Sequence, residues 1–310
     1  MFSRCLACLV LLAAPVTTAC GPRGGGERAP EEGPPRVVAS IFPVADLARK
    51  VGGEAVDVEI LLPPRASPAT FEVTPREIRT VSGARLYLAV GGGLDAWATA
   101  LVEGSSDLRV VVLTDGMELI GEGHGEGTGN PHVWLDPVRV RDELLPRLFD
   151  ALVAVVPDSA RAMGVRSTAL ADTLTALDRE IGAALGGTPT RAFVATHPAW
   201  SYFADRYGLR EVGTLHRHPG QEPSARYLAE LVDEARAAGI RAVFSEPQLA
   251  GTAARALAAE LGVPVVALDP LGGPGVEGRD GYPELLRWNT RQFARGLGGS
   301  AGASDLSDPR

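Results

Sequence analysis

The chain has 310 residues, of which 45% are hydrophobic and 22% are charged, and its formal net charge is −8. That length allows one large or two medium domains, and that composition is ordinary for a globular protein with a sizeable core. The acidic balance, with no run of Lys or Arg, disfavours a nucleic-acid partner.

The N-terminus indicates export. Its sequence, MFSRCLACLVLLAAPVTTAC, has one basic residue and then an apolar run that is too short to span a bilayer comfortably. We therefore expect a signal peptide over residues 1–19. The stretch resembles a bacterial lipoprotein signal, which would make Cys20 the lipidated residue; the alternative is simple cleavage with Cys20 as a free thiol. Cys5 and Cys8 also fall here, so no cysteine remains for a disulfide framework or metal site downstream.

Residues 20–35 are rich in Gly and Pro and predict a flexible tether. From residue 36, apolar runs typical of strands alternate with helical patterns. The expected strands are 36–41, 56–62, 86–90 and 109–113, then 192–196, 210–215, 242–246 and 263–269. This alternation predicts parallel sheets flanked by helices.

Helix starts are marked by local signals. Thr74-Pro75-Arg76-Glu77 is a capping box with proline at the first helical position. Asp136-Pro137 predicts another helix start, with the helix continuing to about residue 155.

One long helical pattern, residues 158–186, separates the two sets of strands; it places Leu170, Leu174, Leu177 and Ile181 on one face. The sequence therefore predicts an α/β protein with two lobes, 36–157 and 187–298, each a mostly parallel sheet flanked by helices. The rigid helix joining them should restrict hinge motion. The last residues, 299–310, read as a disordered tail.

Polar residues stand where the predicted strands end. His197, Glu246 and Asp269 close or follow strands of the second lobe, and His132 lies in a loop of the first. Ligands bind at the carboxyl ends of parallel strands, so two histidines and a carboxylate from two lobes are a plausible site for Zn²⁺, Mn²⁺ or Fe²⁺. The alternatives are loop or helix-end histidines and, for Asp269, a turn or N-cap residue.

The chain resembles the periplasmic solute-binding proteins of zinc and manganese ABC transporters. The resemblance runs from about residue 36 to 297 and includes VVASIFPVADLARKVGGEAVDVEILLPPRASP, NPHVWLDP, THPAWSYFADRYGL, VFSEPQ and ALDPLG. It implies one divalent metal between two α/β lobes, a membrane permease as partner, and a monomer in the periplasm or at the cell surface. By position it implies His132, His197 and Asp269 as metal ligands, with zinc first, and manganese or Fe²⁺ as alternatives.

One ligand position of the family is changed. The resemblance implies a histidine where this chain has Ala69, and a glycine where it has Arg65. Three outcomes are open: water takes the place of the missing ligand, a carboxylate of Glu72 or Glu246 supplies it, or tight metal binding is lost. We expect a retained but altered site. Glu246 reads better as a support for a ligand, and Glu72 as a surface residue.

Three further histidines, His124, His216 and His218, read as loop residues, with weak metal recruitment as the alternative. Two other functions stay open at this point. One is a binding protein that has changed its ligand to a metal chelate or an organic solute. The other is a metalloenzyme with two histidines and one carboxylate, although no HExxH motif or adjacent base supports it and we expect no enzyme.

Overall fold

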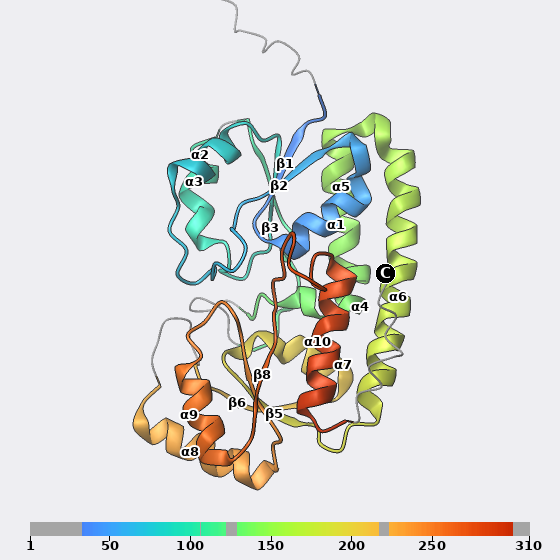
Figure 1. Cartoon of the computed structure of the whole chain (residues 1–310). Coiled ribbons are helices and arrows are strands. Elements are labelled where there is room, and N and C mark those ends of the chain that lie inside the picture. The colour runs from blue at the N-terminus through green and yellow to red at the C-terminus, as the bar shows by residue number, and fades with distance from the viewer. Residues whose placement is uncertain (1–32, 106, 122–128, 217–222, 300–310) are drawn as a thin grey trace, which may run out of the picture. The chain divides into compact units, whose positions relative to one another are not determined.

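Two four-stranded parallel sheets form the framework of the computed structural model, which describes residues 33–105, 107–121, 129–216 and 223–299. The first sheet has the order β2-β1-β3-β4 and the second β6-β5-β7-β8, so both have the same topology (Figure 1). The strands are β1 Arg36–Ala39, β2 Asp57–Ile60, β3 Leu86–Ala89, β4 Arg109–Val112, β5 Ala192–Ala195, β6 Arg210–Thr214, β7 Val243–Ser245 and β8 Val265–Ala267. The predicted two-lobed α/β fold is confirmed.

The order of the strands creates an equivalent crevice in each sheet. The chain leaves β1 for β2 on one side and returns to β3 on the other; β5, β6 and β7 repeat this path. Such a reversal leaves an open crevice at the carboxyl ends of the two central strands, where α/β proteins bind ligands. The central strands β3 and β5 are buried along their whole length, whereas the edge strand β4 exposes Val110 and Val112.

Helices flank both sheets. Those of the first half are α1 Phe42–Gly52, α2 Pro75–Ser82, α3 Thr99–Glu103, α4 Pro137–Arg139 and α5 Leu145–Val155. Those that follow are α6 Ala160–Gly186, α7 Ser201–Tyr207, α8 Ala225–Ala238, α9 Thr252–Leu261 and α10 Tyr282–Gly296. The capping box predicted at α2 is present, because Thr74 and Glu77 each bond to the backbone of the other.

Helix α6 is the long connector. It has 27 residues, so it is about 40 Å long, and it follows a 3-10 turn at Pro157–Ser159. The four residues predicted to share one face are all buried. Arg166 on α6 donates to the carbonyl oxygens of Val51 and Gly52, each at 2.7 Å, which fixes it to the end of α1. Glu180, further along α6, accepts from Arg287 of α10 at 2.7 Å.

The C-terminal helix α10 contacts the first half of the chain as well as α6 (Figure 1). At its first residue, the backbone N–H of Tyr282 donates to Asp46 of α1 at 2.7 Å. The hydroxyl of the same tyrosine donates to the carbonyl oxygen of Trp134 at 2.7 Å. Both lobes are therefore tied together by α6 and by the start of α10.

The predicted signal peptide, Cys20, and nearly all of the predicted tether and tail lie outside the described residues. Within the described part of the chain, no helix is both long enough and apolar enough to cross a membrane.

Candidate metal centre

His132 is held in a buried and well-packed loop. It precedes a 3-10 turn at Val133–Leu135, and its exposed fraction is only 5%. Trp134 and Leu135 are fully buried, and Asp136 caps α4 by accepting the N–H groups of Val138 and Arg139. The apolar residues after His132 thus anchor the loop in the core, and the cap fixes where the next helix begins.

His197 lies just beyond a strand of the second lobe. One residue separates it from the end of β5, and it precedes the 3-10 turn Pro198–Trp200, which leads into α7. The preceding Thr196 donates to the carbonyl oxygen of Phe244 at 3.1 Å, which ties the end of β5 to β7. The side chain of His197 therefore stands at the carboxyl end of a central strand, beside the crevice.

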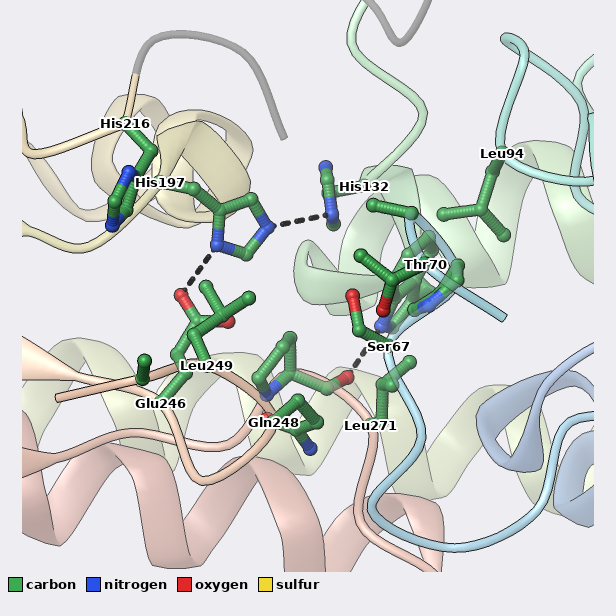
Figure 2. A pocket seen from close by; sticks show the side chains of 15 residues that line it. Ser67, Thr70, Leu94, His132, His197, His216, Glu246, Gln248, Leu249 and Leu271 are labelled. Atoms are coloured by element: carbon green, nitrogen blue, oxygen red, sulfur yellow. Dashed lines mark hydrogen bonds and ion pairs between the residues drawn. The ribbon is translucent and has the colours of Figure 1, made fainter. Parts of the chain in front are cut away.

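The two imidazoles meet between the lobes. Their Nε2 atoms are 3.3 Å apart, as the dashed line in Figure 2 marks. Two nitrogen ligands of a tetrahedral Zn²⁺, each at about 2.0–2.1 Å, are separated by about 3.3–3.4 Å. The separation of the two Nε2 atoms therefore matches one edge of a zinc coordination tetrahedron.

Asn130 fixes the tautomer of His132. Its Oδ1 atom accepts the backbone N–H of His132 at 3.0 Å and lies 2.7 Å from Nδ1 of the same residue. Its Nδ2 atom donates to the carbonyl oxygen of Pro198 at 2.6 Å, so the amide has only one consistent orientation. Nδ1 of His132 therefore bears the proton, and Nε2 presents its lone pair towards His197. Asn130 was not predicted from the sequence, although its place two residues before His132 was the available signal.

Glu246 orients the ring of His197, as Asn130 orients that of His132. Its Oε1 atom lies 2.7 Å from Nδ1 of His197, and the carboxylate is almost fully buried. This is the arrangement in which a carboxylate orients a metal-binding histidine and raises its basicity. Glu246 thus contacts the outer nitrogen of the ring, which agrees with a supporting role.

The electrostatics of the pair favour a positive charge between the rings. Burial opposes protonation of His197, but the charge and hydrogen bond of Glu246 outweigh burial and raise the pKa of the imidazole. Near His197, burial raises the pKa of the Glu211 carboxyl to about 7, although the charge of His197 acts to lower this pKa. Two lone pairs at 3.3 Å repel each other unless a proton or a metal ion lies between them. The geometry can hold either one.

Asp269 is engaged elsewhere. Its carboxylate accepts from Gln248 at 2.7 Å and from the backbone N–H groups of Leu271 and Gly272, and it pairs with Arg279 at 3.0 Å. Among the described contacts of Asp269, none is to either imidazole. Within the residues that the structure describes, no group of three or more His, Cys, Asp or Glu side chains is arranged to hold a metal ion.

A cavity of about 270 Å³ lies beside the two imidazoles. Its walls come from loops that follow β2, β6, β7 and β8 and from the His132 loop. They include Ala69, and also His216, which lies two residues beyond the end of β6. His216 was predicted to lie in a surface loop, although it follows a predicted strand just as His197 does.

Of the remaining candidates, only Glu72 belongs to the described residues. Glu72 is exposed and does not line the cavity. His124 and His218 lie outside the described residues.

The comparison with family models supports a metal-transport protein. Residues 37–296 match the model of the periplasmic zinc-uptake complex component A, ZnuA. The zinc-binding lipoprotein AdcA of Streptococcus pneumoniae serotype 4 is 28% identical over 254 residues, which cover 77% of this chain and 50% of AdcA. The chain thus spans about half the length of AdcA.

Two further relatives match this chain over nearly their own full length. The manganese-binding lipoprotein MntA of Halalkalibacterium halodurans is 26% identical over 298 residues, which are 94% of this chain and 98% of MntA. A crystal structure of ZnuA, 28% identical, aligns with a TM-score of 0.77 over 85% of this chain and 99% of that one.

Proposed function

Because the chain belongs to the family of the periplasmic zinc-uptake complex component A, we propose that it captures a divalent transition metal outside the cytoplasm and delivers it to an ABC permease. Zinc is the first candidate and manganese the second, since the relatives include proteins named for each. The observation behind this proposal is the 3.3 Å separation of the His132 and His197 Nε2 atoms, with each Nδ1 atom held by a neighbouring oxygen.

His132 and His197 are the first two ligands in this proposal. Both rings bind as neutral imidazoles, so metal binding expels the proton that His197 otherwise gains, and acid releases the metal. Asp269 is the third ligand. Its carboxylate reaches the metal only after it has broken its contacts with Arg279 and Gln248. Metal binding is therefore linked to movement of the loop after β8.

The export signal and the anchor belong to the same proposal. Residues 1–19 are the signal peptide, Cys20 is lipidated, and 20–35 tether the folded part to the membrane. That AdcA and MntA are named lipoproteins supports this. The contacts that α6 and α10 make with both lobes support small closure of a monomer around the metal, with lobe boundaries at 36–157 and 187–298.

Metal analysis of the purified chain tests the proposal. We expect about one zinc or manganese ion per chain, and a rise in thermal stability when either is added to chelator-treated protein. His132→Ala and His197→Ala should each abolish both effects. His216→Ala is the matched control, because it removes an imidazole from the same cavity but leaves the Nε2 pair intact. Retained binding in both ligand variants contradicts the site, and turnover of ester or phosphate substrates would support a metalloenzyme instead.

A further inference from the structure

We propose that the metal is bound as a complex with a small organic carboxylate that chelates it, and that this ligand occupies the cavity beside Ala69. The proposal rests on the proposed function, since it takes the ion to lie between His132 and His197. It adds the chemical class of a second ligand, which contributes a carboxylate oxygen and one further nitrogen or oxygen donor.

The protein donors leave coordination positions for such a ligand. His132 and His197 each supply one nitrogen, and Asp269 adds at most one oxygen when it leaves Arg279. The loop after β2 lines the cavity with Ser67, Pro68, Ala69 and Thr70, and Ala69 has no donor atom. His216 also lines the cavity, but within the described residues no third His, Cys, Asp or Glu joins the two imidazoles in a group that could hold a metal ion. A four- to six-coordinate metal at this place therefore needs one or more donors from outside the chain.

The size of the cavity exceeds what one or two water ligands need. At about 30 Å³ of liquid volume each, about nine water molecules would fill the 270 Å³ available. The volume approaches the lower end of pockets that bind small organic molecules, about 300 Å³. A compact bidentate chelator fits this space, whereas a peptide or a large siderophore does not.

The walls of the cavity suit an apolar body. Leu94, Leu249 and Leu271 line it around the imidazoles, as Figure 2 shows. Leu94 and Leu271 are almost fully buried, so their side chains form a fixed surface. The hydrocarbon part of an organic ligand packs favourably against these aliphatic side chains, whereas ordered water beside them finds polar partners only on the other parts of the wall.

The charge balance favours an anion. Both imidazoles are neutral when they bind metal, so the Glu246 carboxylate beside His197 supplies one negative charge. The negative charge of Asp269 is matched by Arg279, so a divalent cation keeps one uncompensated positive charge even if Asp269 binds it. Burying such a charge beside apolar walls is unfavourable without a counter-charge, which a carboxylate supplies.

Two hydroxyl groups stand on the wall where the carboxylate would lie. Ser67 and Thr70 line the cavity on either side of Ala69 in the sequence, and both are labelled in Figure 2. Each hydroxyl is a donor suited to a carboxylate oxygen. The loop after β2 thus offers hydrogen bonds to the ligand although it offers no metal ligand at residue 69.

The experiment uses picolinate as the probe and its isomer nicotinate as the control. Both are aromatic carboxylates of equal size and charge, but only picolinate places its ring nitrogen where it chelates. Zinc affinity of the full chain is measured by calorimetry at free zinc concentrations set by a buffer. We expect saturating picolinate to tighten zinc binding at least tenfold, nicotinate to change it less than twofold, and picolinate without zinc not to bind.

Ala69→His supplies a protein donor at the same wall and is the decisive variant. It should bind zinc tightly without picolinate, and picolinate should no longer increase its zinc affinity. Glu72→His, at an exposed position outside the cavity, should behave as wild type. Equal zinc affinity with and without picolinate, or removal of zinc by picolinate, overturns the chelator and leaves the metal site standing. Absence of zinc binding under every condition overturns both.

Discussion

Asp269 and Arg279 form an ion pair of 3.0 Å in which the carboxylate is almost fully buried. The guanidinium also lies over the ring of Trp288, 4.3 Å from its centroid. Gln248 and two backbone N–H groups complete the partners of the carboxylate. In this state Asp269 is held by the protein, and it must give up Arg279 before it can bind a metal.

Removal of Arg279 should therefore favour metal binding. In Arg279→Met, which keeps an unbranched apolar stem, we expect zinc affinity to rise about tenfold while the metal-free protein loses about 1–3 kcal/mol of stability. Zinc titration at buffered free zinc and urea unfolding in EDTA give the two values. Asp269→Asn is the companion variant and should weaken zinc binding. If Arg279→Met binds zinc no better than wild type, Asp269 is not a ligand.

Loss of the Glu246 charge should weaken binding through His197. Glu246→Gln keeps an acceptor near Nδ1 but removes the charge that raises the pKa of His197, and changes of this kind cost about 10–100-fold in metal affinity. Since the raised pKa lets protons compete with metal above pH 6.5, the variant should hold zinc to lower pH relative to its own maximum. Zinc titrations from pH 5 to 8 measure both effects. Glu72→Gln, an exposed carboxylate, is the control and should change neither.

Glu211 should make the metal-free protein less stable at high pH. Its pKa is raised by burial from 4.5 to about 7, so the folded state binds this proton more tightly than the unfolded state does. The stability that the proton contributes is complete below pH 4.5 and is lost as the pH rises through 7. Glu211→Gln should therefore be more stable than wild type at pH 8, by on the order of 1–3 kcal/mol, but not at pH 4.5. Urea unfolding in EDTA at the two pH values measures this, and an equal change at both would contradict it.

The buried face of α6 should dominate its contribution to stability. Leu174→Ala removes a fully buried side chain and should cost about 2–5 kcal/mol. Val165, on the same helix, is 68% exposed, so Val165→Ala should change stability by less than about 0.5 kcal/mol. Urea unfolding of both variants without metal tests the contrast. Similar losses would show that the two faces of α6 contribute alike.

Local signals in the sequence predicted the elements well where one short motif decides the structure. The capping box at Thr74 and the buried leucines of α6 are examples, because capping and helical periodicity act within a few residues. The helix expected from Asp136 to about residue 155 is interrupted by a π-helical turn at Val140–Leu144. Pro146 explains it, since proline lacks an N–H and clashes with the preceding helical turn, which a wider turn accommodates.

The site was predictable only in part. The position of His197 after a predicted strand identified it, and His132 was predicted from its loop in the first lobe. Nothing local indicates that the Nε2 atoms of these two residues, 65 positions apart in the sequence, meet. The partners of Asp269 depend on the path of the loop that brings Arg279 back towards β8, and sequence periodicity carries no information about such a path. The same limit applied to His216, whose position in the cavity wall depends on how the chain turns after β6.

The shared strand order of the two sheets has an evolutionary consequence. β2-β1-β3-β4 and β6-β5-β7-β8 are the same arrangement written twice, as expected if one ancestral half was duplicated and fused through α6. Each half contributes one imidazole to the pair, His132 from the first and His197 from the second. A single half presents only one of these nitrogens, so this donor pair came into existence only when two halves, as separate copies or as one chain, faced each other.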